Sequence, residues 1–350
     1  MSVIVPLVVL GLLIFMHELG HFVAAKRGGF AVLELSFGMG PRLLRIRSGD
    51  TDYSLRLLPF GGFVRVASQV GDAPGDPVVS PERTYEGRPL PARLAFIAAG
   101  PAMNFVLALV LLIAVFWVIG IDQPVLDSTV LGDVVAGSPA AQAGLRPGDR
   151  VVAIDGQPVA DWASMVARVQ DALGRTVAIA YERSGIRYEA EVAPAPHPRD
   201  PSRGYLGVAT GVRHTRLPLF AAVRQSVVEV GRMLAVWFVG LAGIFAGGGA
   251  PDVSGPVGII QMLGEATRFG LANLFYLAAM ISANFALINL FPIPALDGSR
   301  LVFLALEKVR GRPVPPEQEG RIHMFGYALL MALLVLLTYR DLIRLVGAGR

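Results

Sequence analysis

The sequence lacks cysteine altogether and has few charged residues. Without cysteine, disulfide bonds and thiolate zinc sites are excluded, so any bound metal must be held by histidine and carboxylate side chains. Only 17% of the 350 residues are charged, whereas soluble domains carry about a quarter. The net charge of +4 is modest, and the basic residues lie in blocks between apolar runs. That distribution argues against a nucleic-acid partner.

Apolar residues are abundant instead. They make up 53% of the chain, and the mean hydropathy is +0.56, which indicates an integral membrane protein. Residues 2–25 are long enough to span a bilayer, because about 20 apolar residues suffice. They begin without the positive charge of a signal peptide, and cleavage would remove the histidine motif at their end. We therefore expect a retained transmembrane helix. Further apolar segments cover about 92–120, 217–246, 271–291 and 322–338.

A β-rich region follows the first apolar segment. Residues 30–68 contain short stretches rich in β-forming residues, separated by turn signals such as Gly38-Met39-Gly40-Pro41. The expected strands are Ala31–Ser36, Leu43–Arg47, Tyr53–Leu57 and Phe63–Ala67. They predict a small β-meander, followed by a polar loop at 69–91. We expect the next apolar segment to be broken near its start by Gly100-Pro101.

Residues 121–212 have the composition of a soluble domain. The stretch from Ser138 to Asp149 precedes a predicted strand, Val151–Ile154, and a helix near Trp162–Leu173. This pattern resembles a PDZ domain of the type found in bacterial proteases. The loop Gly204-Tyr205-Leu206-Gly207 resembles the PDZ loop whose backbone N–H groups bind a peptide C-terminus, placed last as in circularly permuted members. The alternative is that these are only turn glycines.

Residues 17–21 read His-Glu-Leu-Gly-His inside the first apolar segment. On a helix, His17 and His21 lie on one face, so both imidazoles can reach one metal ion. The adjacent Glu18 can take a proton from water activated by zinc. Ionisable residues inside a membrane helix are costly and therefore functional by default. The motif predicts a zinc peptidase site with Glu18 as the general base.

A catalytic zinc site usually has three protein ligands. The remaining histidines, His197, His214 and His323, are expected to be ordinary surface or interfacial residues. The favoured third ligand is Asp297, because Pro292 and Pro294 break the helix at membrane depth, where irregular backbone is tolerated only beside protein or water. The alternative is a helix-capping aspartate.

The whole chain is similar to the site-2 protease family, on three features: the motif at 17–21, the Asn289-to-Gly298 segment and the intervening PDZ-like domain. The match is to RseP-like bacterial members with a single PDZ domain. Gly100-Pro101 and Asn104 are similar to a motif that opens the family's second span, and the β-rich region is similar to its membrane-reentrant β-loop. The resemblance implies one Zn²⁺ held by His17, His21 and Asp297. It also implies that Asn289, and with it Asn104, helps to hold the substrate.

The three metal ligands determine the expected topology. They must lie at one depth, so the first span and 271–291 must run in the same direction. That requirement excludes a crossing by 217–246, which contains Arg224, Glu229 and Arg232 and is expected to lie at the interface. The expected fold is a polytopic α-helical membrane protein with four transmembrane helices, a membrane-reentrant β-sheet and an inserted α+β PDZ domain. The expected divisions are 1–120, 121–212 and 213–350.

The distribution of lysine and arginine between the loops predicts the orientation of the chain in the membrane. Ten lie between Lys26 and Arg93 and five between Arg300 and Arg321, so both loops should be cytoplasmic. Arg340, Arg344 and Arg350 argue mildly against this. The active site would then face the cytoplasmic side of a bacterial inner membrane, with the PDZ domain in the periplasm or outside the cell.

The function predicted is intramembrane proteolysis of single-span membrane proteins, such as anti-sigma factors or signal-peptide remnants. The β-rich region would pair with an unwound substrate, and the PDZ domain would bind peptide C-termini. Two other functions stay open. The first is a catalytically inactive PDZ scaffold, and the intact set of metal ligands argues against it. A metal transporter usually shows internal repeats, and none is apparent.

Overall fold

The computed structural model describes residues 3–68, 77–198, 200–245 and 254–348. Parts of the expected loop at 69–91 and of the expected interfacial segment therefore lie outside the described residues, as does Arg350 of the orientation argument. The chain divides into two compact units. The first combines 1–119 with 217–350, and the second is 120–216. Each is described by itself.

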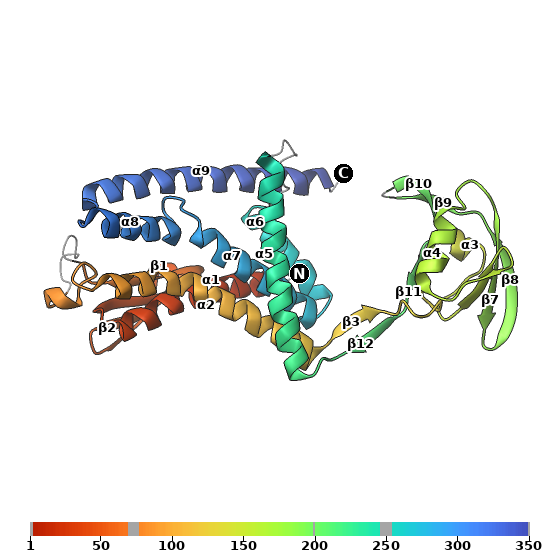
Figure 1. Ribbon diagram of the computed structural model, residues 1–350, viewed down its shortest axis with the longest axis horizontal. Helices are drawn as coiled ribbons and strands as arrows, with labels where there is room; N and C mark the ends of the chain where they lie inside the picture. Colours follow the sequence, from red (N-terminus) through yellow and green to blue (C-terminus); the bar gives the residue numbers. More distant parts are fainter. Residues whose placement is uncertain (1–2, 69–76, 199, 246–253, 349–350) are drawn as a thin grey trace. The chain divides into compact units, whose positions relative to one another are not determined.

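Four described helices of the first unit are long and apolar enough to cross a membrane, and the sequence predicted that number. They are α1 (Ile4–Arg27), α2 (Leu90–Ile113) with the π-helical turn η2 (Ala114–Ile119), α7 (Leu271–Leu290) and α9 (Pro316–Ala348). In Figure 1 the axes of these four helices point in roughly the same direction, whereas α5 (Leu219–Phe245) crosses them. The remaining helices of this unit are the short η1 (Pro81–Arg83), α6 (Pro256–Arg268) and α8 (Asp297–Arg310).

Helices α1 and α2 pack closely against each other, and α2 also packs against α7. Gly20 allows the first contact, since a Cβ there would lie 2.2 Å from the carbonyl oxygen of Ala99. The expected break at Gly100-Pro101 is wrong, because α2 continues through Pro101. A proline removes one helical N–H, but the neighbouring helices of a membrane protein can satisfy the freed carbonyls.

The β-rich region consists of two long strands, β1 (Val32–Ser48) and β2 (Thr51–Val66), which bend and pair repeatedly. Ser36 pairs with both Phe63 and Ser54, and Ser54 also pairs with Arg45. The expected meander is therefore wrong, because 62–66 lies beside 32–37 rather than beside 51–56. Alternating apolar residues predict strands but not their order, which here depends on packing against α1.

The second unit has its own core. A four-stranded sheet, ordered β6-β5-β7-β8, packs with α4 around buried residues that include Met165 and Ile179. Short strand pairs complete the unit: β3 with β12, β4 with β11 and β9 with β10. The bounds are β3 (Ile121–Pro124), β4 (Leu131–Val134), α3 (Pro139–Gln142), β5 (Arg150–Ile154), β6 (Gln157–Pro158), α4 (Trp162–Gln170), β7 (Val177–Arg183), β8 (Ile186–Val192), β9 (Ala195–His197), β10 (Asp200–Tyr205), β11 (Val208–Thr210) and β12 (Val212–Thr215).

Candidate metal centre

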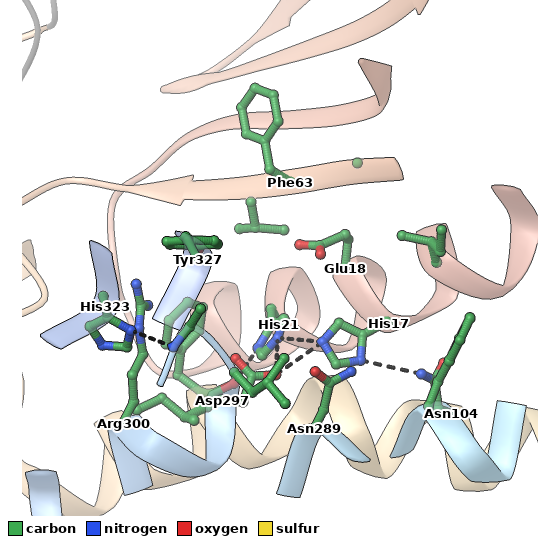
Figure 2. A pocket seen from close by; sticks show the side chains of 18 of the residues that line it. His17, Glu18, His21, Phe63, Asn104, Asn289, Asp297, Arg300, His323 and Tyr327 are labelled. Carbon is green, nitrogen blue, oxygen red and sulfur yellow. Dashed lines mark hydrogen bonds and ion pairs between the residues drawn. The ribbon is translucent and has the colours of Figure 1, made fainter. Parts of the chain in front are cut away.

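Two histidines of α1 meet one aspartate from the start of α8. His17 and His21 are one helical turn apart and buried, and their Nε2 atoms lie 3.1 Å from each other. The Oδ2 atom of Asp297 lies 3.0 Å from His17 Nε2 and 3.3 Å from His21 Nε2. Figure 2 shows both rings turned toward the carboxylate. Residues 280 positions apart in the chain thus form one group of potential metal ligands.

The spacing of these three atoms fits zinc. Bonds of about 2.0–2.1 Å in a tetrahedral arrangement put neighbouring ligand atoms roughly 3.3 Å apart. The three donor atoms stand 3.0–3.3 Å apart. His21 Nδ1 donates to the carbonyl oxygen of Phe96 at 2.8 Å, which fixes the tautomer that leaves Nε2 free to bind a metal.

Asn104 of α2 lies beside the other histidine. Its side-chain amide is 3.3 Å from His17 Nδ1, and its Oδ1 is buried with no hydrogen-bond partner among the described residues. With Nε2 on a metal, Nδ1 of His17 carries a proton and needs an acceptor. A half-turn of the Asn104 amide puts the orphaned oxygen there. This unpaired oxygen is what a ligated His17 requires.

Glu18 lies in a cavity of about 430 Å³ next to these ligands. In Figure 2 its carboxylate is turned toward the strand that carries Phe63. The strand approaches closely, since a Cβ at Gly62 would lie 3.4 Å from Glu18 Cγ. Asn289, at the end of α7, lines the same cavity and is half-buried. The cavity therefore places a carboxylate, an amide and a strand edge around the ligand group.

Asp297 does not act as a helix cap. It is the first residue of α8, and the N-cap position is Leu296, which makes no side-chain capping bond. The helix-cap alternative therefore does not account for it. Two other histidines, His197 and His214, belong to the second unit.

Some residues that line the cavity were missed by the sequence reasoning. They are Met39, Phe63, Arg300, His323 and Tyr327. Arg300 had a signal, because it follows Asp297 by three positions on one helix. His323 was expected to be an ordinary interfacial residue, and no local pattern links it to the motif at 17–21.

The comparisons with known proteins decide the family. The sequence profile described as Peptidase family M50 matches residues 5–333. The chain belongs to this family. It is 32% identical to the zinc metalloprotease RasP of Shouchella clausii, over 96% of this chain and 97% of the relative. It is 28% identical to the regulator of sigma-W protease RasP of Bacillus subtilis, over 98% and 99%. The chain is therefore an intramembrane zinc metalloprotease, a metalloendopeptidase whose cofactor is Zn²⁺.

Solved structures match a smaller part of the chain. The crystal structure of the PDZ domain of an SdrC-like protein from Listeria innocua is 24% identical and covers 26% of this chain and all of that one, with a TM-score of 0.22. A solution structure from Geobacillus thermodenitrificans is 32% identical, covers 22% of this chain and 88% of that one, and has a TM-score of 0.20.

Proposed function

We propose that one Zn²⁺ is held by His17, His21 and Asp297, and that Glu18 is the general base for peptide hydrolysis. The observation that carries this proposal is the convergence of three donor atoms within 3.0–3.3 Å of one another beside a carboxylate in a shared cavity. Zn²⁺ at such a site supplies a Lewis acid that polarises the scissile carbonyl and lowers the pKa of water. Glu18 then takes the proton of the attacking water and returns it to the leaving amine.

Two asparagines have different roles in this proposal. Asn104 is almost fully buried and touches His17, so it orients that ligand rather than the substrate. Asn289 borders the cavity with its amide side chain, and it donates to the carbonyl oxygen on which negative charge develops.

The edge of β2 receives the substrate as an added strand. Among the described residues, Gly62–Val66 has one strand neighbour, Val32–Phe37, and Gly62, Phe63 and Val64 line the cavity beside Glu18. A transmembrane helix has no accessible peptide bonds until it unwinds. Pairing with this edge satisfies the backbone groups that unwinding exposes, because each unpaired group in lipid costs several kcal/mol. The sheet therefore lies at membrane depth, as a reentrant element.

The second unit acts as a PDZ domain that binds peptide C-termini. A groove of about 190 Å³ lies between α4 and Gly204–Val208. Among the described residues, the N–H groups of Leu206 and Gly207 donate to no backbone carbonyl outside the helices and strands. They are therefore free to bind a carboxylate. A peptide from the newly cut end of a substrate should bind with a free C-terminus, and its amidated form should bind much more weakly.

The site also supports a four-span topology. His17 and His21 lie in the second half of α1, and Asp297 directly follows the segment after α7, so both helices deliver ligands from the same direction. We place this end on the cytoplasmic side of a bacterial inner membrane and 120–216 on the other side. Because the chain has no cysteine, Phe220→Cys and Val239→Cys can report on the two ends of α5. Labelling of these ends from opposite sides of the membrane would refute the topology.

The substrates proposed are single-span membrane proteins. The Bacillus subtilis relative is named for regulating sigma-W, so a membrane-anchored anti-sigma factor is the first substrate class to test, with signal-peptide remnants second. Glu18→Gln should retain Zn²⁺ and cleave a single-span substrate in liposomes about 10²–10⁴-fold more slowly than the wild type. Glu265→Gln, on the exposed face of α6, is the matched control. Wild-type cleavage by Glu18→Gln would overturn the mechanism.

A further inference from the structure

The last span touches the loop that carries the third ligand. His323 of α9 accepts a hydrogen bond at Nδ1 from the backbone N–H of Ala295, at 3.0 Å. Ala295 is two residues before Asp297. Figure 2 shows His323 next to Arg300 at one end of the cavity, with Asp297 farther in beside the two histidines of α1. A side chain 26 positions beyond the ligand in sequence therefore contacts the ligand's own loop.

The backbone at Ala295 is strained. Its φ is +79°, in the region that residues with a Cβ disfavour. The turn Ile293-Pro294-Ala295-Leu296 is closed by the Leu296 N–H donating to the Ile293 carbonyl at 3.1 Å. Proline at the second position and a positive φ at the third are the features of a type II turn, which favours glycine where Ala295 stands. The turn therefore needs support from outside its own residues.

Helix α9 supplies that support through one face. Gly326 is one turn after His323, and a Cβ there would lie 2.4 Å from both the Cβ and the carbonyl oxygen of Pro294. Tyr327 lies on the same face and lines the cavity. An edge contact with Phe303 holds the His323 ring, and Glu319 Oε1 lies 3.5 Å from Nε2, which makes no hydrogen bond among the described residues. Since Nδ1 accepts, Nε2 carries the proton of the neutral ring and faces that carboxylate.

We propose that His323 is a positioning residue for the zinc site. It holds the strained Pro294–Ala295 turn, which places the Asp297 carboxylate at the two histidines. The proposal rests on the proposed ligand role of Asp297 and adds to it a residue that is not itself a metal ligand. Most of α9 is exposed, whereas His323 and Gly326 face the protein.

Zinc affinity of the full-length protein in detergent, measured by competition with a chromophoric chelator, tests this role. His323→Leu removes the acceptor and should weaken Zn²⁺ binding about tenfold or more, the range found for residues that orient metal ligands. His323→Asn keeps an oxygen acceptor close to the position of Nδ1 and should retain most of the affinity. Met324→Leu, on the exposed side of α9, is the matched control and should bind as the wild type does.

A second variant separates positioning from packing. Ala295→Gly makes the positive φ cheap, because glycine adopts it readily. The loss caused by His323→Leu should therefore be smaller in the Ala295→Gly background than in the wild type, which is a double-mutant cycle. A purely structural role for His323 predicts equal losses in both backgrounds, and that result would overturn the proposal.

Asp297→Ala distinguishes this positioning role from the proposed ligand set on which it rests. If Asp297→Ala weakens Zn²⁺ binding and His323→Leu leaves it at the wild-type value, the ligand set stands and the positioning role is wrong. If Asp297→Ala itself binds Zn²⁺ like the wild type, the ligand assignment and the positioning role both fail. Loss of affinity in both variants, with recovery in His323→Asn, supports both.

Discussion

Gly100 is the residue whose change should separate folding from zinc binding most clearly. It lies in α2 against the two histidines of α1. A Cβ at this position would lie 2.3 Å from His21 Nε2 and 2.8 Å from His17 Nε2, the two atoms proposed to bind the metal. Gly100→Ala therefore places a methyl group against the lone pairs that Zn²⁺ needs.

The magnitude follows from these distances. Non-bonded carbon contacts are about 3.5–4.0 Å, so at least one ring must move by roughly 1 Å. Metal–ligand distances tolerate only about 0.2 Å, so at least one histidine is lost as a ligand. An extra methyl in a packed interior costs about 1–3 kcal/mol, which leaves the chain folded when the metal is absent. We expect Zn²⁺ affinity to fall more than about 100-fold, beyond the range for residues that only orient ligands.

The assay compares metal content with folding. Purified Gly100→Ala should contain little zinc by elemental analysis, compete poorly with a chelator for Zn²⁺ and cleave no single-span substrate. Its circular dichroism should match that of the wild type. Gly231→Ala, on α5 with no atom within 4 Å of the added Cβ, is the control. Wild-type affinity in Gly100→Ala would refute the placement of the two Nε2 atoms around the metal.

The second unit provides two further predictions, both measured on a 120–216 fragment, which has its own core. Ile179→Ala, in the middle of β7, should lower the free energy of urea unfolding by about 2–5 kcal/mol, whereas Ile186→Ala, on the exposed start of β8, should change it little; equal effects would contradict the proposed core. Burial alone would raise the pKa of Asp149, but hydrogen bonds from the Arg183 guanidinium and the Arg146 N–H hold that pKa below its usual value. A lowered folded-state pKa gives stability that is present above the unfolded-state value of about 3.9 and is lost as the pH falls through the folded-state value. The unfolding free energy should therefore fall more steeply below about pH 4 in the wild type than in Asp149→Asn, and identical pH profiles would contradict this account.

The apolar segments were predictable because each carries its signal locally. A run of about 20 apolar residues marks a candidate span, although excluding 217–246 also required the shared depth of the three expected ligands. Pairing of the β-rich strands was not predictable, because alternation assigns a face and not a neighbour: Ser36 pairs with Phe63 and Ser54, which follow it by 27 and 18 positions. The course of α2 through Pro101 was missed for a related reason, since proline's effect depends on which groups surround the freed carbonyls.

The sequence by itself determined the chemistry of this protein. Histidines four positions apart lie on one face of any helix, so the motif at 17–21 needed no tertiary information to predict a metal site inside a membrane span. Only the tertiary structure decided which side chains lie beside these two histidines and which contacts hold them there. The contact of Asp297 with His17, the contact of Asn104 with His17 and the bond from Ala295 to His323 all join parts of the chain that are far apart in the sequence. Sequence spacing fixes geometry within one helix but not between helices, because the distance between helices depends on how their side chains pack.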